Sequence, residues 1–176
     1  FSIKENNWLG KGMQVSANAD VSQDSLRGSL SFTDTNYNFT GKSLTYNLEN
    51  IKNDKPDSGY ENSLLGAGIG VSYEKFKDIY FAPGVKFSID DLSTDETASE
   101  LLKKQSGTTT DLMFDYSLFT DKRDRTFMPT SGNLTSFYQE LPLYAESVYV
   151  KNSFSSSHYK EFSDTSILST ELFFYG

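Results

Sequence analysis

The sequence predicts an all-β fold: an antiparallel, up-and-down transmembrane β-barrel, of which this chain forms the greater part. Three observations predict it. Apolar and polar residues alternate along roughly ten segments, turns containing glycine or proline separate them, and aromatic residues make up 15% of a chain that is only 36% hydrophobic. Strands of a membrane barrel face lipid on one side and a polar lumen on the other, so they are only half apolar.

Composition argues against several other classes of protein. The formal net charge is −8, which disfavours nucleic acid as a partner because phosphate binding needs a basic patch. The absence of cysteine removes disulfide frameworks and thiolate metal sites. The longest run of apolar residues and glycine, 64–71, is far shorter than the roughly 20 residues that a membrane-spanning helix needs. The aromatic content disfavours disorder.

In the first half of the chain, every second residue of the alternating segments is apolar. Successive side chains of a strand point to opposite faces, so each apolar set is expected to face lipid. The lipid-facing residues predicted there are Val15, Ala17, Leu30, Phe32, Leu44, Leu48, Ile69 and Val71. Gly66, Gly68 and Gly70 alternate with apolar residues, so we expect them to clear space in a crowded lumen rather than form a nucleotide loop.

The second half of the chain continues the pattern with less regular faces. The lipid-facing residues predicted there are Phe87, Phe114, Tyr116, Val150 and Leu172. Pro83 and Gly84 are expected to break the middle of the strand over 79–90, because proline cannot donate to a ladder. Residues 133–141 are strand-like without clean faces, and 1–5 is expected to be a stub.

The connections are the second signal. We expect tight joints near 9–12, 37–41, 74–78 and 129–132, and longer polar loops over 50–62 and 90–110. Short turns on one side and longer loops on the other are typical of membrane barrels. Aromatic residues gather near the short joints, as in an interfacial girdle: Trp8, Tyr37, Phe39, Phe76, Phe127 and Phe162.

One short helix is predicted inside the long loop, on the extracellular side. Residues 93–96 read as a capping box in front of Ala98, Leu101 and Leu102, and Gly107 follows the expected end. The helix lies within a loop rather than between domains. The sequence therefore predicts neither a linker nor a domain boundary.

Catalytic and metal chemistry are poorly supported. The single histidine, His158, follows three serines, but neighbours on a strand point to opposite faces, so we expect a plain lumen or turn histidine. Asp90 with Asp91, and Asp121 with Asp124, fit solvated loops better than weak calcium sites. We expect no enzymatic activity, no cofactor and no metal ligand.

The most distinctive stretch joins two strands with alternating charges and a Pro-x-x-Gly turn. The residues that we single out in it are Asp121, Arg123, Asp124, Arg125, Phe127, Pro129 and Gly132. Physically, it reads as a lumen-facing ion-pair cluster above a tight periplasmic turn. A solvated hairpin end explains these residues equally well.

Three motifs resemble the Omp85 superfamily. Asp124-Arg125-x-Phe127-x-Pro129-x-x-Gly132 resembles its charged strand-turn signature, and 31–39 is similar to the fourth strand and turn of the barrel in its outer-membrane assembly factors. The remaining motif looks like an early periplasmic turn of that barrel and comprises Asn7, Trp8, Leu9, Gly10 and Gly12.

This resemblance implies that 1–176 is part of a single outer-membrane barrel domain with about sixteen strands in the whole protein. The chain would run from the second strand to the eleventh. The first strand, the last five strands, the sixth extracellular loop with its Arg-Gly-Phe-type tip and the periplasmic POTRA repeats would lie outside it. The expected location is the bacterial outer membrane.

The resemblance also implies a function: folding and inserting β-barrel proteins into the outer membrane through a lateral gate. An unpaired strand edge in lipid is costly, so an opened seam offers an edge to an incoming strand without nucleotide or covalent chemistry. The partners implied are unfolded outer-membrane proteins, outer-membrane lipid and lipopolysaccharide, and accessory assembly lipoproteins. The alternatives are a passive channel, a two-partner-secretion barrel and a soluble β-sandwich binding module.

Overall fold

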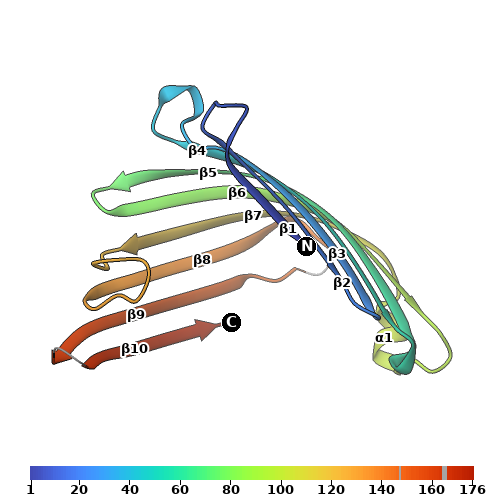
Figure 1. Cartoon of the computed structure of the whole chain (residues 1–176). Helices are drawn as coiled ribbons and strands as arrows, with labels where there is room; N and C mark the ends of the chain where they lie inside the picture. Colours follow the sequence, from blue (N-terminus) through green and yellow to red (C-terminus); the bar gives the residue numbers. More distant parts are fainter. Residues whose placement is uncertain (147, 164–165) are drawn as a thin grey trace.

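The computed structural model of the chain describes residues 1–146, 148–163 and 166–176. These residues form one antiparallel sheet in which each strand pairs with the next along the chain (Figure 1). Its ten strands are β1 (Ser2–Trp8), β2 (Met13–Val21), β3 (Ser25–Asp34), β4 (Ser43–Lys55), β5 (Tyr60–Phe76), β6 (Ile79–Thr94), β7 (Gly107–Asp121), β8 (Gly132–Tyr144), β9 (Lys151–Ser163) and β10 (Ser166–Tyr175).

The sheet is strongly curved and remains open, with β1 and β10 at its two edges (Figure 1). Among the described residues, β1 pairs only with β2 and β10 only with β9. The predicted all-β, antiparallel, up-and-down order is confirmed. The strand at residues 1–5 is longer than the expected stub, because β1 pairs with β2 as far as Trp8.

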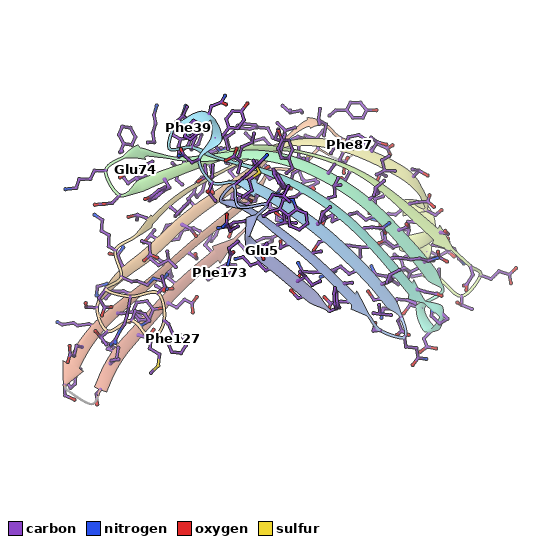
Figure 2. All side chains as sticks on the ribbon, turned by 45° about the horizontal axis from the view of Figure 1, so that its top comes forward. Glu5, Phe39, Glu74, Phe87, Phe127 and Phe173 are labelled. Carbon is purple, nitrogen blue, oxygen red and sulfur yellow. The ribbon has the colours of Figure 1, made fainter. Side chains whose placement is uncertain are left out.

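Strand register decides which side chains share a face. One row of paired residues is Phe32, Tyr46, Ile69, Val85 and Phe114. The adjacent row, on the opposite face, is Ser31, Asn47, Gly68, Lys86 and Met113. We call the first, convex side the outer face and the second, concave side the inner face. Figure 2 shows Phe87 on the convex side.

All the residues predicted to face lipid that lie in strands share the outer face. Val150 immediately precedes β9 and lies outside any strand. The register therefore agrees with the faces assigned from the alternation. That the outer face contacts lipid stays a prediction.

The loop expected over 50–62 is largely strand, so this prediction was wrong, whereas the loop expected over 90–110 is present but shorter and covers 95–106. The β4–β5 ladder continues to the Lys55–Tyr60 pair, and only 56–59, with a short 3-10 turn, connects the two strands. The connection expected to be tight, between β7 and β8, instead covers 122–131. The polar stretches mislead because a ladder extends past the apolar part of its strands wherever backbone groups still find partners.

The predicted break at Pro83 is also wrong. β6 runs through it, and Pro83 pairs with Tyr116 of β7. On the other side of β6, the ladder with β5 has no pair between Gly70–Gly84 and Tyr73–Phe81. The missing N–H of proline thus interrupts one ladder locally without ending the strand.

The helix α1 (Glu100–Gln105) lies in the predicted loop but begins later than predicted. Its N-cap is Ser99, whose hydroxyl accepts a hydrogen bond from the backbone N–H of Leu102 at 3.3 Å. The expected capping box fails because Ser93 and Thr94 still belong to β6. No helix in the described ranges is long and apolar enough to cross a membrane.

A hydrogen bond and a close approach of Gly59 hold the loop that contains α1 against the β4–β5 connection. Asp95 N–H donates to the Gly59 carbonyl at 2.9 Å, and Ala98 is buried. Gly59 has a φ of +69°, and a Cβ there would lie 2.3 Å from Thr97 Oγ1. Glycine is therefore required at this contact.

Candidate functional site

The charged 122–131 connection is organised by Asp124. Its Oδ1 accepts hydrogen bonds from the N–H groups of Thr130 (2.9 Å) and Ser131 (3.1 Å), and its Oδ2 accepts one from the Thr130 hydroxyl (2.8 Å). The bonds from Ser131 and Thr130 favour the ionised carboxylate and lower the pKa of Asp124 to about 2. Asp124, near the start of the connection, thus holds residues near its end in place.

Arg123 forms a bidentate ion pair with Asp121, the last residue of β7. Arg123 Nε donates to Asp121 Oδ1 at 2.8 Å, and Nη2 donates to Oδ2 at 2.7 Å. This contact raises the pKa of Arg123. Asp121 belongs to the inner-face set of β7, so the structure has the predicted ion pair on the inner side, above a longer connection than expected.

The rest of the charged motif projects from the sheet. Arg125 lies 3.6 Å from Asp124 and is largely exposed, and Phe127 is 77% exposed on its projecting connection (Figure 2). Pro129 precedes Thr130. Gly132 begins β8 with a φ of +97°, and a Cβ there would lie 2.0 Å from the Lys122 carbonyl oxygen. The 122–131 connection therefore combines the two features that the sequence suggested as alternatives: ion pairs at its base and an exposed tip.

A hydrogen bond to an asparagine side chain closes the predicted turn motif, and a second turn is closed in the same way. Asn7 Oδ1 accepts a hydrogen bond from the Gly12 N–H at 2.7 Å, and Asn36 Oδ1 accepts one from the Gly41 N–H at 2.9 Å. Both glycines have a φ near +70°. The Thr35 hydroxyl joins the two turns by donating to the Gly12 carbonyl at 3.1 Å.

Within the turn motif, Gly10 N–H donates to the Asn7 carbonyl at 3.0 Å, and Leu9 has a φ of +55°. Trp8 pairs with Met13 across the hairpin. Sequence reasoning identified this turn but missed Asn36. The signal for it was the repeated spacing, an asparagine five residues before a glycine in both turns.

A cluster on the inner face was missed by sequence reasoning. Lys86 Nζ lies 3.3 Å from Glu140 Oε2 and 3.6 Å from Asp115 Oδ2, and it donates to the Tyr138 hydroxyl at 2.7 Å. The Tyr138 hydroxyl donates in turn to Glu140 Oε2 at 2.6 Å. Glu140 is 8% exposed, so its charge depends on these partners.

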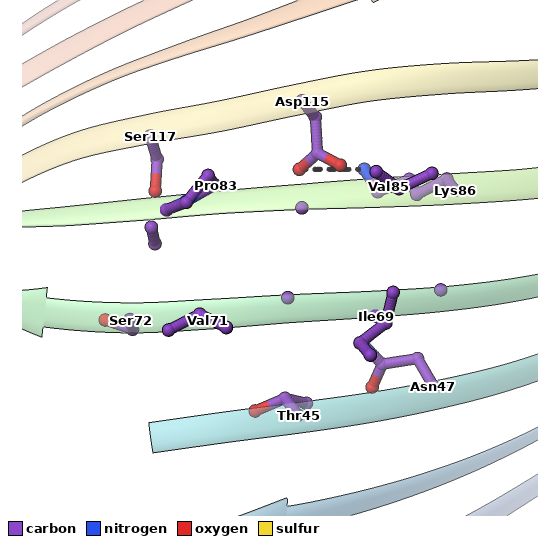
Figure 3. Close-up of a pocket in the computed structure, with 14 residues that line it drawn as sticks. Thr45, Asn47, Ile69, Val71, Ser72, Pro83, Val85, Lys86, Asp115 and Ser117 are labelled. Atoms are coloured by element: carbon purple, nitrogen blue, oxygen red, sulfur yellow. Dashed lines mark ion pairs between the residues drawn. The ribbon is translucent and has the colours of Figure 1, made fainter. Parts of the chain in front are cut away.

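Glycines line the inner face beside this cluster. A hollow of about 210 Å³ there includes Gly68, Gly70, Lys86 and Asp115, and Figure 3 shows the Lys86–Asp115 ion pair at it. A Cβ on Gly66 would lie 2.8 Å from the Glu49 side chain. Gly66 therefore leaves room for the Glu49 side chain, as the sequence predicted, whereas a Cβ on Gly68 or Gly70 would make only ordinary contacts, at 3.6 and 3.5 Å.

A second hollow, of about 470 Å³, lies further along the inner face. Glu49, Asp111 and Glu140 line it together with Lys86 and Tyr149. Acidic groups therefore outnumber the single lysine there. Such a trough can hold water and attract cations, but it contains no arrangement of nucleophile and base.

His158 does not lie in the lumen or in a turn, which corrects the prediction. It belongs to β9, where it pairs with Asn133 and Thr170 on the outer face. Asp90 and Asp91 lie in β6 rather than in a solvated loop; Asp90 accepts a hydrogen bond from Asn62, and Asp91 accepts one from Thr108. No group of three metal-ligating side chains occurs within the described ranges.

Comparison with protein families gives a match to the Omp85 superfamily domain over residues 7–173. The chain belongs to the Omp85 superfamily. It is an outer-membrane β-barrel protein, and the predicted resemblance is confirmed. A comparison with curated proteins found no match.

Among solved structures, this Omp85 chain is similar to the crystal structure of BamA from Haemophilus ducreyi lacking POTRA domains 1-3. The TM-score is 0.79 at 18% identity, over 99% of this chain and 37% of that chain. The chain thus spans just over a third of that structure's length. This likeness shows the fold of a BamA-type barrel wall.

Proposed function

We propose that this Omp85 chain is a wall segment of a barrel that folds and inserts other β-barrel proteins into the bacterial outer membrane. The observation that carries the proposal is the superfamily domain match over 7–173, combined with a sheet that follows a BamA barrel over 99% of the chain. Insertion itself would take place at a lateral gate formed by the barrel seam.

The two faces of the sheet suit this role. The apolar outer face would anchor the wall in lipid, and the polar inner face would border a water-filled interior. Insertion by strand addition needs an exposed strand edge rather than catalytic groups. The inner-face cluster around Lys86 and Glu140 would then stiffen the wall, not perform chemistry.

The partners proposed are unfolded outer-membrane proteins, outer-membrane lipid and lipopolysaccharide, and accessory assembly lipoproteins. The end of the sheet that carries 9–12, 35–42 and 122–131 lies opposite α1 (Figure 1). Since α1 is predicted to be extracellular, this end would be periplasmic. Exposed Phe39 and Phe127 there would meet the inner leaflet or an accessory protein.

Depletion of the full-length protein tests the proposal. The outer-membrane levels of many unrelated β-barrel proteins should fall together, whereas lipoproteins of the same membrane should not. Loss of a single client would contradict a general insertase and favour a secretion barrel. The polar inner face also permits a passive channel, and large, steady, substrate-selective single-channel currents with unchanged barrel levels would favour that function.

A further inference from the structure

The two ends of the sheet carry opposite charge. The described connections at the end opposite α1, which we call the turn end, are 9–12, 35–42, 77–78 and 122–131 (Figure 1). They contain six cations against two carboxylates: Lys11, Lys42, Lys77, Lys122, Arg123 and Arg125 against Asp78 and Asp124. The connections 22–24, 56–59, 95–106 and 145–150, at the α1 end, reverse this ratio: Asp24, Asp57, Asp95, Glu96, Glu100 and Glu146 against Lys103 and Lys104.

Several cations at the turn end are free to bind an external anion. Lys11, Lys77 and Lys122 are exposed, and none of them forms an ion pair or a cation–π contact with another described residue. Near the α1 end, by contrast, lysines pair with carboxylates of the chain at 3.3 Å or less: Lys52 with Glu61, Lys55 with Asp24 and Lys103 with Glu100. The free positive charge of the sheet therefore gathers at the turn end.

The turn end also carries apolar side chains on strained backbone. In the described ranges, every residue other than glycine with a left-handed φ lies in its connections: Leu9, Asn38, Phe39, Asp78 and Met128. Leu9, Phe39 and Met128, which we call the apolar tips, are 76%, 95% and 66% exposed. Asparagine, aspartate and glycine fit this backbone at lower cost, so large apolar side chains here need a reason beyond the turns themselves.

The apolar tips are spread along the edge of the sheet rather than gathered in one patch. They lie on the β1–β2, β3–β4 and β7–β8 connections, and Figure 2 shows Phe39 and Phe127 on separate connections. Neighbouring strands are about 4.8 Å apart, so the tips extend over roughly 30 Å of the curved edge. A lipid surface contacts such an extended rim at every point, because headgroups surround the end of a membrane barrel.

We propose that the turn end binds the anionic phospholipid headgroups of the periplasmic leaflet, with the apolar tips placed below the phosphates. Surfaces that combine lysine or arginine with exposed apolar groups bind anionic membranes by charge attraction and apolar burial. The carboxylates of the α1 end would repel the same headgroups. The inference goes beyond the proposed function: it rests on the membrane barrel and its orientation, not on insertion, so failure of either leaves the other standing.

Spin-labelled lipids test the headgroup contact. The full-length protein is reconstituted in phosphatidylcholine vesicles with traces of spin-labelled phosphatidylglycerol or phosphatidylcholine, and the motionally restricted fraction of each label gives their relative association. The triple variant Lys11→Gln/Lys77→Gln/Lys122→Gln should lower the association of phosphatidylglycerol relative to phosphatidylcholine by about twofold or more. Salt at about 1 M should abolish the difference between the variant and the unsubstituted protein, because it screens exposed charges.

The matched control is Lys52→Gln/Lys103→Gln/Lys104→Gln, which removes as many charges near the α1 end and should leave the preference unchanged. Heat-shifted gel mobility verifies folding of both variants. An equal loss in the two triple variants would mean that net charge alone sets the preference and would overturn the proposal. So would an unchanged preference in the first variant, or a loss seen only with spin-labelled lipopolysaccharide.

A second measurement locates the apolar tips. Phe39→Cys, spin-labelled in the full-length protein without other cysteines, should be more accessible to oxygen than to a water-soluble nickel complex in phosphatidylglycerol-containing vesicles. Leu101→Cys is the control, because Leu101 is also an exposed apolar residue, 67% exposed, but belongs to α1 at the other end. Its label should show the reverse order. A label at position 39 that lies in water would refute the membrane contact.

Discussion

Lys86 of β6 reaches across β7 to Glu140 of β8, with its Nζ 3.3 Å from Glu140 Oε2. The two residues are 54 positions apart in the chain, and Tyr138 binds both. Three strands are thereby joined on the inner face by side chains as well as by backbone ladders. The contact places a nearly buried carboxylate in the centre of the wall.

Removing this contact should destabilise the barrel. Lys86→Met leaves Glu140 without its cation, and because Lys86 is itself half exposed we expect a loss of about 1 kcal/mol in free energy of unfolding. Denaturant unfolding of the full-length protein in micelles measures it, with Glu140→Gln and the double variant completing the cycle. Lys52→Met, which breaks the exposed Lys52–Glu61 pair, is the control and should cost less. Equal losses would contradict the structural role.

The hydrogen bonds of Asp124 predict a pH dependence. Its pKa is depressed from 3.8 to about 2, so its stabilisation of the 122–131 connection is present above pH 3.8 and is lost as pH falls through about 2. Pepsin cleavage after Phe127, normalised to an unstructured peptide, should therefore rise between about pH 4 and pH 2. Asp124→Asn should be cleaved readily over that whole window. A variant that follows the unsubstituted protein would rule out this carboxylate as the cause.

Gly132 should be intolerant of any side chain. A Cβ at this position would lie 2.0 Å from the Lys122 carbonyl oxygen, at a φ of +97°. We expect Gly132→Ala to cost about 2 kcal/mol or more in free energy of unfolding. Gly28→Ala is the matched control, since nothing lies within 4 Å of its Cβ position. Comparable thermal stability of the two variants would show that the connection can rearrange.

Phe87 tests whether the outer face meets lipid. Arginine at the middle of a lipid-facing strand costs about 2–4 kcal/mol, whereas a lumen-facing position tolerates it. Phe87→Arg should therefore lower the free energy of unfolding in lipid vesicles by that amount, and Ser88→Arg, on the inner face of the same strand, should change it little. The reverse order would mean that the two faces have been exchanged.

The Asn7–Gly12 turn was predictable, and the Lys86–Glu140 cluster was not. Asparagine and glycine act within one turn, so their roles follow from local geometry. Lys86, Asp115 and Glu140 come from three strands, and they meet only because the β6–β7 and β7–β8 registers align them. Their charges at strand centres were visible, but their pairing was not.

The sequence by itself determined the faces of the strands and the strand order, because side chains alternate with a period of two and short turns join neighbours. Only the tertiary structure decided where strands end and what each face carries. β4 continues to Lys55, since Tyr60 of β5 pairs with it, and Ser99 caps α1, since 93–94 remain in the β6 ladder. Backbone hydrogen bonds between distant segments set those limits, and no local pattern encodes them.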